Sequence, residues 1–88
     1  MFVIIVYDVG IKRVNKVLKI CRKYLNWIQN SVLEGEIEES GVMRLLSDLK
    51  KVIDESEDSL LIYKFRTTKY FSRELIGIEK GIKDQFLL

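Results

Sequence analysis

A carboxylate stands at the end of the first apolar segment of the chain. Residues 2–6 are consecutive β-branched and aromatic residues, and Tyr7 and Asp8 follow them. Such a short run predicts a strand buried on both faces, so we expect Asp8 at the rim of a sheet. A carboxylate there is suited to bind a metal ion or to act as a general base. The alternative is that Asp8 caps the start of the following helix, as acids in strand-to-helix loops often do.

A metal site built on Asp8 requires more ligands than one chain offers. Mg²⁺ takes six oxygens and usually binds one or two carboxylates together with phosphate. If two copies pair with the ends of their first strands at the two-fold axis, the two Asp8 side chains can share one Mg²⁺. The bound ion would stabilise charge on a scissile phosphate and supply a hydroxide-like nucleophile. We therefore expect the site to be a property of a dimer.

Basic residues follow Asp8 at helical spacing. Apolar residues between positions 14 and 25 recur with a helical period and predict a helix over 11–25. The bases between them line one side of that helix, and a stripe of this kind binds the phosphates of nucleic acid without regard to sequence. Arg13 is close enough to Asp8 to clamp a phosphate, and Arg66 extends the patch. The alternative is a solvated lysine face. The predicted nucleic-acid contacts are Lys12, Arg13, Lys16, Lys19, Lys23 and Arg66.

The charge is distributed unevenly although its net value is only +2. Residues 1–33 carry six bases and one acid, residues 34–58 carry three bases and nine acids, and residues 59–88 carry six bases and three acids. A basic and an acidic face on one small chain indicate a polyanionic partner on one side.

Several classes of chemistry are excluded by residue types that are missing. The chain has no histidine, which excludes Ser-His-Asp and Cys-His catalysis and any His-ligated metal site. The single cysteine, Cys21, excludes an intrachain disulfide and lies on the apolar stripe of the 11–25 helix, where we expect a packed thiol. No apolar run is long enough to span a bilayer, so we expect no membrane partner and a cytoplasmic location.

The elements that must position these residues fit one small domain over residues 1–88. After the first strand and helix we expect a hairpin over 26–37, a helix over 40–55 with Ser40 as N-cap, and a strand over 59–65. A short final strand over 75–78 completes the series. This order predicts an α+β, ferredoxin-like βαββαβ fold with an extra C-terminal strand. We divide it into a core, 1–66, and a C-terminal dimerisation segment, 67–88.

Three segments together resemble the CRISPR-associated protein 2 family. They are VIIVYDV at 3–9, IQNSVLEGEI at 28–37 and DSLLIYKF at 58–65, in that order and separated by a basic helix and a second helix. The resemblance covers residues 1–65. It implies a ferredoxin-like homodimer in which Asp8 matches the family's metal-binding acid, with Tyr7 beside it. It also implies that Arg13 and Ser31 match positions linked to the nuclease site.

The resemblance further implies a task in CRISPR spacer acquisition. Family members form the small dimer held between two dimers of the adaptation integrase, where it supports the DNA that becomes a spacer. The chain is then expected to be a Mg²⁺-dependent endonuclease that cleaves single-stranded RNA or DNA. The alternative is a catalytically silent, nucleic-acid-binding scaffold in the integrase complex. A small interaction domain of the same fold is a third interpretation.

Overall fold

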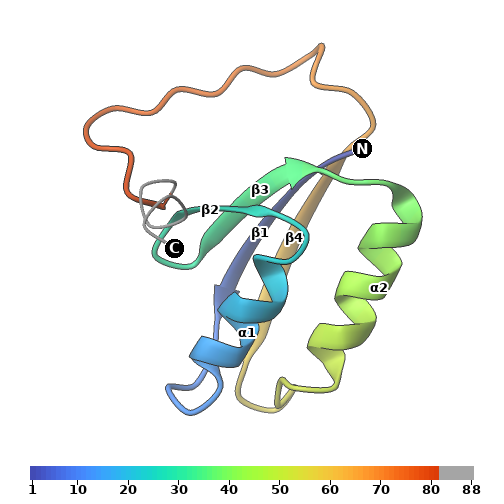
Figure 1. Ribbon diagram of the computed structural model, residues 1–88, viewed down its shortest axis with the longest axis vertical. Helices are drawn as coiled ribbons and strands as arrows, with labels where there is room; N and C mark the ends of the chain where they lie inside the picture. Colours follow the sequence, from blue (N-terminus) through green and yellow to red (C-terminus); the bar gives the residue numbers. More distant parts are fainter. Residues whose placement is uncertain (82–88) are drawn as a thin grey trace.

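Four strands pair into one antiparallel sheet in the order β2-β3-β1-β4. The computed structural model describes residues 1–81 (Figure 1). The elements are β1 (Phe2–Asp8), α1 (Val14–Cys21), β2 (Asn26–Gln29), β3 (Val32–Glu36), α2 (Glu39–Lys50) and β4 (Ser59–Phe65). This βαββαβ order with β1 next to β3 and β4 is the ferredoxin-like arrangement that the sequence predicts.

Strand β1 lies in the interior of the sheet and sets its two faces. It pairs with β3 on one side, from Phe2 opposite Glu36 to Val6 opposite Val32. On the other side it pairs with β4, from Phe2 opposite Phe65 to Asp8 opposite Ser59. Residues at odd positions of β1 are fully buried, whereas those at even positions are half-buried or exposed. The sequence predicts a strand buried on both faces, but within a single chain β1 is buried on one face only.

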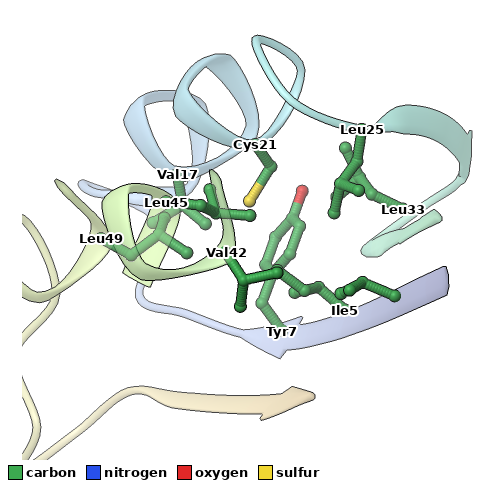
Figure 2. Packing of buried hydrophobic residues seen from close by; sticks show 10 residues of the cluster. Ile5, Tyr7, Val17, Cys21, Leu25, Leu33, Val42, Leu45 and Leu49 are labelled. Carbon is green, nitrogen blue, oxygen red and sulfur yellow. The ribbon is translucent and has the colours of Figure 1, made fainter. Parts of the chain in front are cut away.

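Both helices cover the face formed by the odd positions of β1 (Figure 1). The apolar stripe of α1 meets that of α2 over the sheet, and the side chains fill the space between the layers (Figure 2). The core members are Val3, Ile5, Tyr7, Val17, Cys21, Leu25, Leu33, Val42, Leu45 and Leu49. This core fixes β1, and with it the position at which Asp8 leaves the sheet.

Within residues 1–81, the opposite face of the sheet carries apolar side chains without a helix over them. Ile4 and Val6 of β1 are half-buried there, and on β4 Leu61 and Tyr63 are 53% and 47% exposed. Because strand residues alternate between faces, these four side chains share one side with Asp8. We call the side formed by Ile4, Val6, Leu61 and Tyr63 the open face.

Some element boundaries differ from those that the sequence predicts. The first helix begins at Val14 rather than at residue 11, because residues 10–13 form a loop held by distant contacts. Ser40 is not an N-cap: α2 begins at Glu39 with Glu38 as its N-cap residue. The second helix ends at Lys50, before the predicted position 55, because turns occupy the segment that leads to Asp58.

The segment after β4 crosses to the β2 side of the sheet (Figure 1). Phe71 packs against Phe65 and Phe2 with ring centroids 4.7 and 5.4 Å away, and Arg73 Nε lies 2.8 Å from Glu34 Oε1. The strand predicted over 75–78 is not formed, because its backbone has no ladder partner in the part of the chain that the structure describes. The last seven residues of the predicted dimerisation segment, 82–88, lie outside the described residues. No helix within residues 1–81 is long and apolar enough to cross a membrane.

Candidate functional site

Asp8 is the exposed last residue of β1, at the rim that the sequence predicts. Its ladder partner on β4 is Ser59. Among residues 1–81 the Asp8 carboxylate has no hydrogen bond or ion pair with another side chain. It does not cap α1, because that helix begins six residues later with Arg13 in the N-cap position and no side-chain cap bond. The carboxylate is therefore available to a ligand on the open face.

Tyr7 directly precedes Asp8, and Ser31 lies across from Tyr7, directly before β3. The Tyr7 N–H donates to the Ser31 carbonyl at 3.1 Å, which places the start of β3 beside the tip of β1. The Tyr7 ring, by contrast, is 5% exposed and lies in the core near Cys21 and Leu25 (Figure 2). Burial raises the pKa of its hydroxyl, and proximity to Cys21 adds to the effect.

The Tyr7 ring therefore cannot reach a phosphate on the open face of the same chain. This placement contradicts the expectation that Tyr7 takes a direct part in catalysis there. Consecutive residues of a strand point to opposite faces, so the ring and the Asp8 carboxylate are separated by the sheet. The Tyr7 hydroxyl is 3.5 Å from the carbonyl oxygen of Asn30 and donates to it. Trp27 Nε1 donates to the same oxygen at 2.9 Å. Tyr7 and Trp27 thus hold the turn that carries Ser31.

Arg13 is engaged by carboxylates of its own chain rather than placed to clamp a phosphate. Its Nε lies 2.6 Å from Asp58 Oδ2, and its Nη2 lies 2.9 Å from Asp58 Oδ1 and 3.1 Å from Glu57 Oε2. A paired guanidinium of this geometry is a strong, directional contact. Arg13 therefore joins the loop after β1 to the loop before β4, which corrects the expectation of a phosphate clamp beside Asp8.

Asp58 is the centre of this arrangement and was not singled out in the sequence. Its side chain is fully buried in the ion pair. Besides Arg13 it accepts the backbone N–H of Gly10 at Oδ1 and that of Asp54 at Oδ2, both at 2.8 Å. The Arg13 hydrogen bonds above all, together with the backbone donors, hold the pKa of the Asp58 carboxyl well below its usual range despite burial. We call Asp58, Gly10, Arg13 and Asp54 the Asp58 latch.

The cationic stripe is present on α1 and its flanks. Lys12, Lys16, Lys19 and Lys23 are all exposed, at spacings of four, three and four residues. Arg22 is half-buried and lies over the Trp27 ring, with its Cζ 5.6 Å from the ring centroid. Arg66 is exposed but follows Phe65, which pairs with Phe2 at the opposite end of the sheet from Asp8. About 20 Å of strand separates it from the Asp8 tip, so it does not extend the patch beside Asp8.

The donors of one chain are insufficient for a complete metal site. No group of three or more His, Cys, Asp or Glu side chains within residues 1–81 is arranged to hold a metal ion. Asp8 offers one exposed carboxylate, and hard oxygen donors of this type suit Mg²⁺. The residues therefore fit a Mg²⁺ site only if a second carboxylate and phosphate oxygens come from outside the chain.

Cys21 is the packed thiol that the sequence predicts. It is fully buried between α1 and the sheet (Figure 2). Burial raises the pKa of its thiol to about 12, so it stays protonated near neutral pH and is a poor nucleophile.

Comparisons with known proteins agree with this fold. A family model described as "CRISPR associated protein Cas2" matches residues 1–73. A "CRISPR-associated endoribonuclease Cas2" of Dictyoglomus turgidum is 54% identical over 99% of this chain and 100% of its own length. A relative of the same description from Thermotoga maritima is 51% identical over 99% of both chains.

Solved structures give the same result. One described as "Crystal structure of cas2" has 45% identity and a TM-score of 0.81, and the match covers 91% of this chain and 90% of the other. Cas2 of Streptococcus pyogenes, crystallised at pH 6.5, has 29% identity and a TM-score of 0.72, covering 85% of this chain and 99% of its own. The chain belongs to the CRISPR-associated Cas2 family.

Proposed function

We propose that two copies of this Cas2-family chain pair through their open faces and cleave phosphodiester bonds with one Mg²⁺ shared by the two Asp8 carboxylates. The observation that carries the proposal is the exposed Asp8 carboxylate at the end of a buried strand, beside an uncovered apolar surface. Leu61 and Tyr63 are half-exposed in the single chain, and burying them against a second copy removes apolar area from water. The C-terminal segment, 67–88, adds to the same interface.

Each group at the tip has a defined part in this mechanism. Asp8 binds the ion together with the Asp8 of the second copy. Such an ion would supply charge neutralisation at the scissile phosphate and activation of the attacking water. The exposed lysines of α1 hold the flanking phosphates. Ser31, fixed next to β1 by the Tyr7 N–H, orients a phosphate oxygen, while Tyr7 and Arg13 act by holding the tip.

The proposed substrate is single-stranded RNA or DNA, in the context of CRISPR spacer acquisition. The names of the relatives state endoribonuclease activity, which favours RNA. The lysine stripe recognises sugar-phosphate chains of either kind, because phosphate contacts carry no sequence information. We propose that the dimer acts with the adaptation integrase, to which it presents nucleic acid.

A specific observation favours a second function, a nucleic-acid-binding scaffold without cleavage. Of the four residues expected at the nuclease site, Tyr7 is buried and Arg13 is paired with Asp58. Of the four expected residues, only Asp8 and Ser31 are then neither buried in the core nor paired with a carboxylate among residues 1–81. A scaffold requires only the α1 lysines and the dimer, both of which are independent of Asp8.

Replacement of Asp8 separates the two functions. For a nuclease, Asp8→Asn removes the ion's ligand, so Mg²⁺-dependent cleavage of labelled RNA is lost while binding of the same RNA is retained. Glu55→Gln is the matched control, because it removes one exposed carboxylate outside the tip. If Asp8→Asn leaves the cleavage rate unchanged, the Mg²⁺ site at Asp8 is wrong. If the wild-type protein binds RNA but does not cleave it, the scaffold function remains.

A further inference from the structure

The Asp58 latch begins where the sheet ends. The ladder between β1 and β4 stops at the Asp8–Ser59 pair. Asp58 comes directly before Ser59, and Gly10 comes two residues after Asp8. The hydrogen bond of 2.8 Å from the Gly10 N–H to Asp58 Oδ1 thus replaces the backbone bonds that a longer ladder would supply. Strand ends fray unless such contacts hold them.

The latch also immobilises the segment that leaves Asp8. Asp58 accepts from Gly10, Asp54 and, through both carboxylate oxygens, Arg13. It therefore joins the loop after β1, the start of β4 and the turn after α2 at one buried point. Its four acceptor bonds satisfy a carboxylate that would otherwise be costly to bury.

Gly10 fits this arrangement because its backbone lies against the Arg13 guanidinium. A Cβ at position 10 would lie 2.6 Å from Arg13 Nη2. The guanidinium cannot move aside cheaply, since its Nη2 is bonded to both Asp58 and Glu57. Gly10 and Arg13 are packed as one unit around Asp58.

We infer that Asp58 is a positioning residue for Asp8: it sets the place and orientation of the β1 tip, and thereby the metal affinity of the site, without contacting metal or substrate. The part of the inference that concerns Mg²⁺ affinity rests on the proposed function. Outer residues that orient a metal ligand typically change affinity about 10- to 100-fold when removed. Asp58→Asn replaces an acceptor oxygen with an amide that faces the Arg13 and backbone donors, so it disrupts the latch without changing side-chain size.

The test uses the full-length protein with Asp58→Asn and the control Glu55→Gln, which removes the same charge from an exposed position nearby. Backbone amide exchange and the resonances of Asp8, Val9 and Gly10 are recorded by NMR without Mg²⁺, and Mg²⁺ affinity is measured by calorimetry. We expect Gly10 exchange in Asp58→Asn to be at least about tenfold faster. We also expect the Asp8 and Val9 resonances to shift and the Mg²⁺ dissociation constant to rise about tenfold or more. Glu55→Gln matches the wild type in each readout.

Two results overturn the inference. The first is that the Gly10 amide exchanges at the same rate in Asp58→Asn as in Glu55→Gln. The second is that Gly10 exchange becomes faster in Asp58→Asn while the Asp8 resonances and the Mg²⁺ affinity stay unchanged. In the second case, Asp58 serves the fold alone. If Asp58→Asn does not fold, Arg13→Gln takes its place, because it keeps both backbone donors of the latch. We expect the same changes from it, and native values in folded Arg13→Gln overturn the inference equally.

The readouts also distinguish this inference from the proposed function. If the wild-type protein binds no Mg²⁺ and cleaves no RNA or DNA, the nuclease function fails. The Asp8 and Val9 resonances in the metal-free protein still decide whether Asp58 positions the tip.

Discussion

The lysines of α1 and its flanks give a prediction whose size follows from their number. Each chain exposes four of them: Lys16 and Lys19 on α1, with Lys12 before it and Lys23 after it. Each phosphate contact to a single strand contributes about −0.7 to the slope of log affinity against log salt concentration. If all eight lysines of a dimer contact phosphates, raising salt from 50 to 200 mM weakens binding roughly 2,000-fold. The variant Lys16→Gln/Lys19→Gln halves the contacts, so the same change of salt weakens its binding only about 50-fold.

Fluorescence anisotropy with a labelled, unstructured RNA measures this slope at several salt concentrations. The matched control is Lys50→Gln/Lys51→Gln, which removes two exposed charges at the end of α2. The control should keep the wild-type slope. The reasoning is refuted if both variants flatten the slope equally, because the effect would then come from net charge, or if the α1 variant keeps the wild-type slope.

Three further predictions concern stability and metal binding. The pKa of Asp58 is lowered in the folded chain, so its ionised form stabilises the fold fully above the ordinary unfolded pKa of about 4. This stabilisation begins to decline as pH falls through that value and is lost as pH approaches the much lower folded value. Urea unfolding from pH 6 to 3 should show the start of the decline, and Asp58→Asn should show a smaller decline, because the lowered pKa of Asp54 contributes in the same direction. Leu45 is fully buried, so Leu45→Ala should reduce the free energy of unfolding by about 2–5 kcal/mol in urea titration. Met43→Ala on the exposed side of the same helix should change it by less than about 0.5 kcal/mol, and equal effects would contradict the described core. Mg²⁺ at 100 times its dissociation constant should stabilise the wild-type protein by about 2.7 kcal/mol in thermal unfolding. It should not measurably stabilise Asp8→Asn, and equal stabilisation of both proteins would mean that the ion binds elsewhere.

Most of the fold was predictable because its determinants are local. The apolar run at residues 2–6 predicts β1, and the segment 59–65 coincides with β4 as observed. Helix ends were less predictable, since they depend on contacts distant in sequence. The start of α1 at Val14 is one case, because residues 10–13 are held by Asp58 from beyond α2.

The candidate site was predictable for Asp8 and much less so for its surroundings. An acid at the end of an apolar strand is a local pattern, and the structure places Asp8 at that tip. The pairing of Arg13 with Asp58 spans 45 residues and has no periodic signal. The only sequence feature that pointed to Asp58 was its position directly before an apolar strand, at the start of the DSLLIYKF segment. Tyr7 was misplaced for a different reason: the family resemblance implied a place beside Asp8 in the site, whereas strand alternation turns its ring into the core.

Whether two chains share one ion can be decided from the separation of the two Asp8 carboxylates in a crystal of the protein grown with Mn²⁺. Oxygens that share one octahedral ion lie about 2.1 Å from it and hence no more than about 4.2 Å from each other. We expect one Mn²⁺ on the two-fold axis, identified by anomalous scattering and bound by an oxygen of each Asp8. A crystal in which the two carboxylates are too far apart for one ion, or in which Mn²⁺ binds away from Asp8, would contradict this expectation.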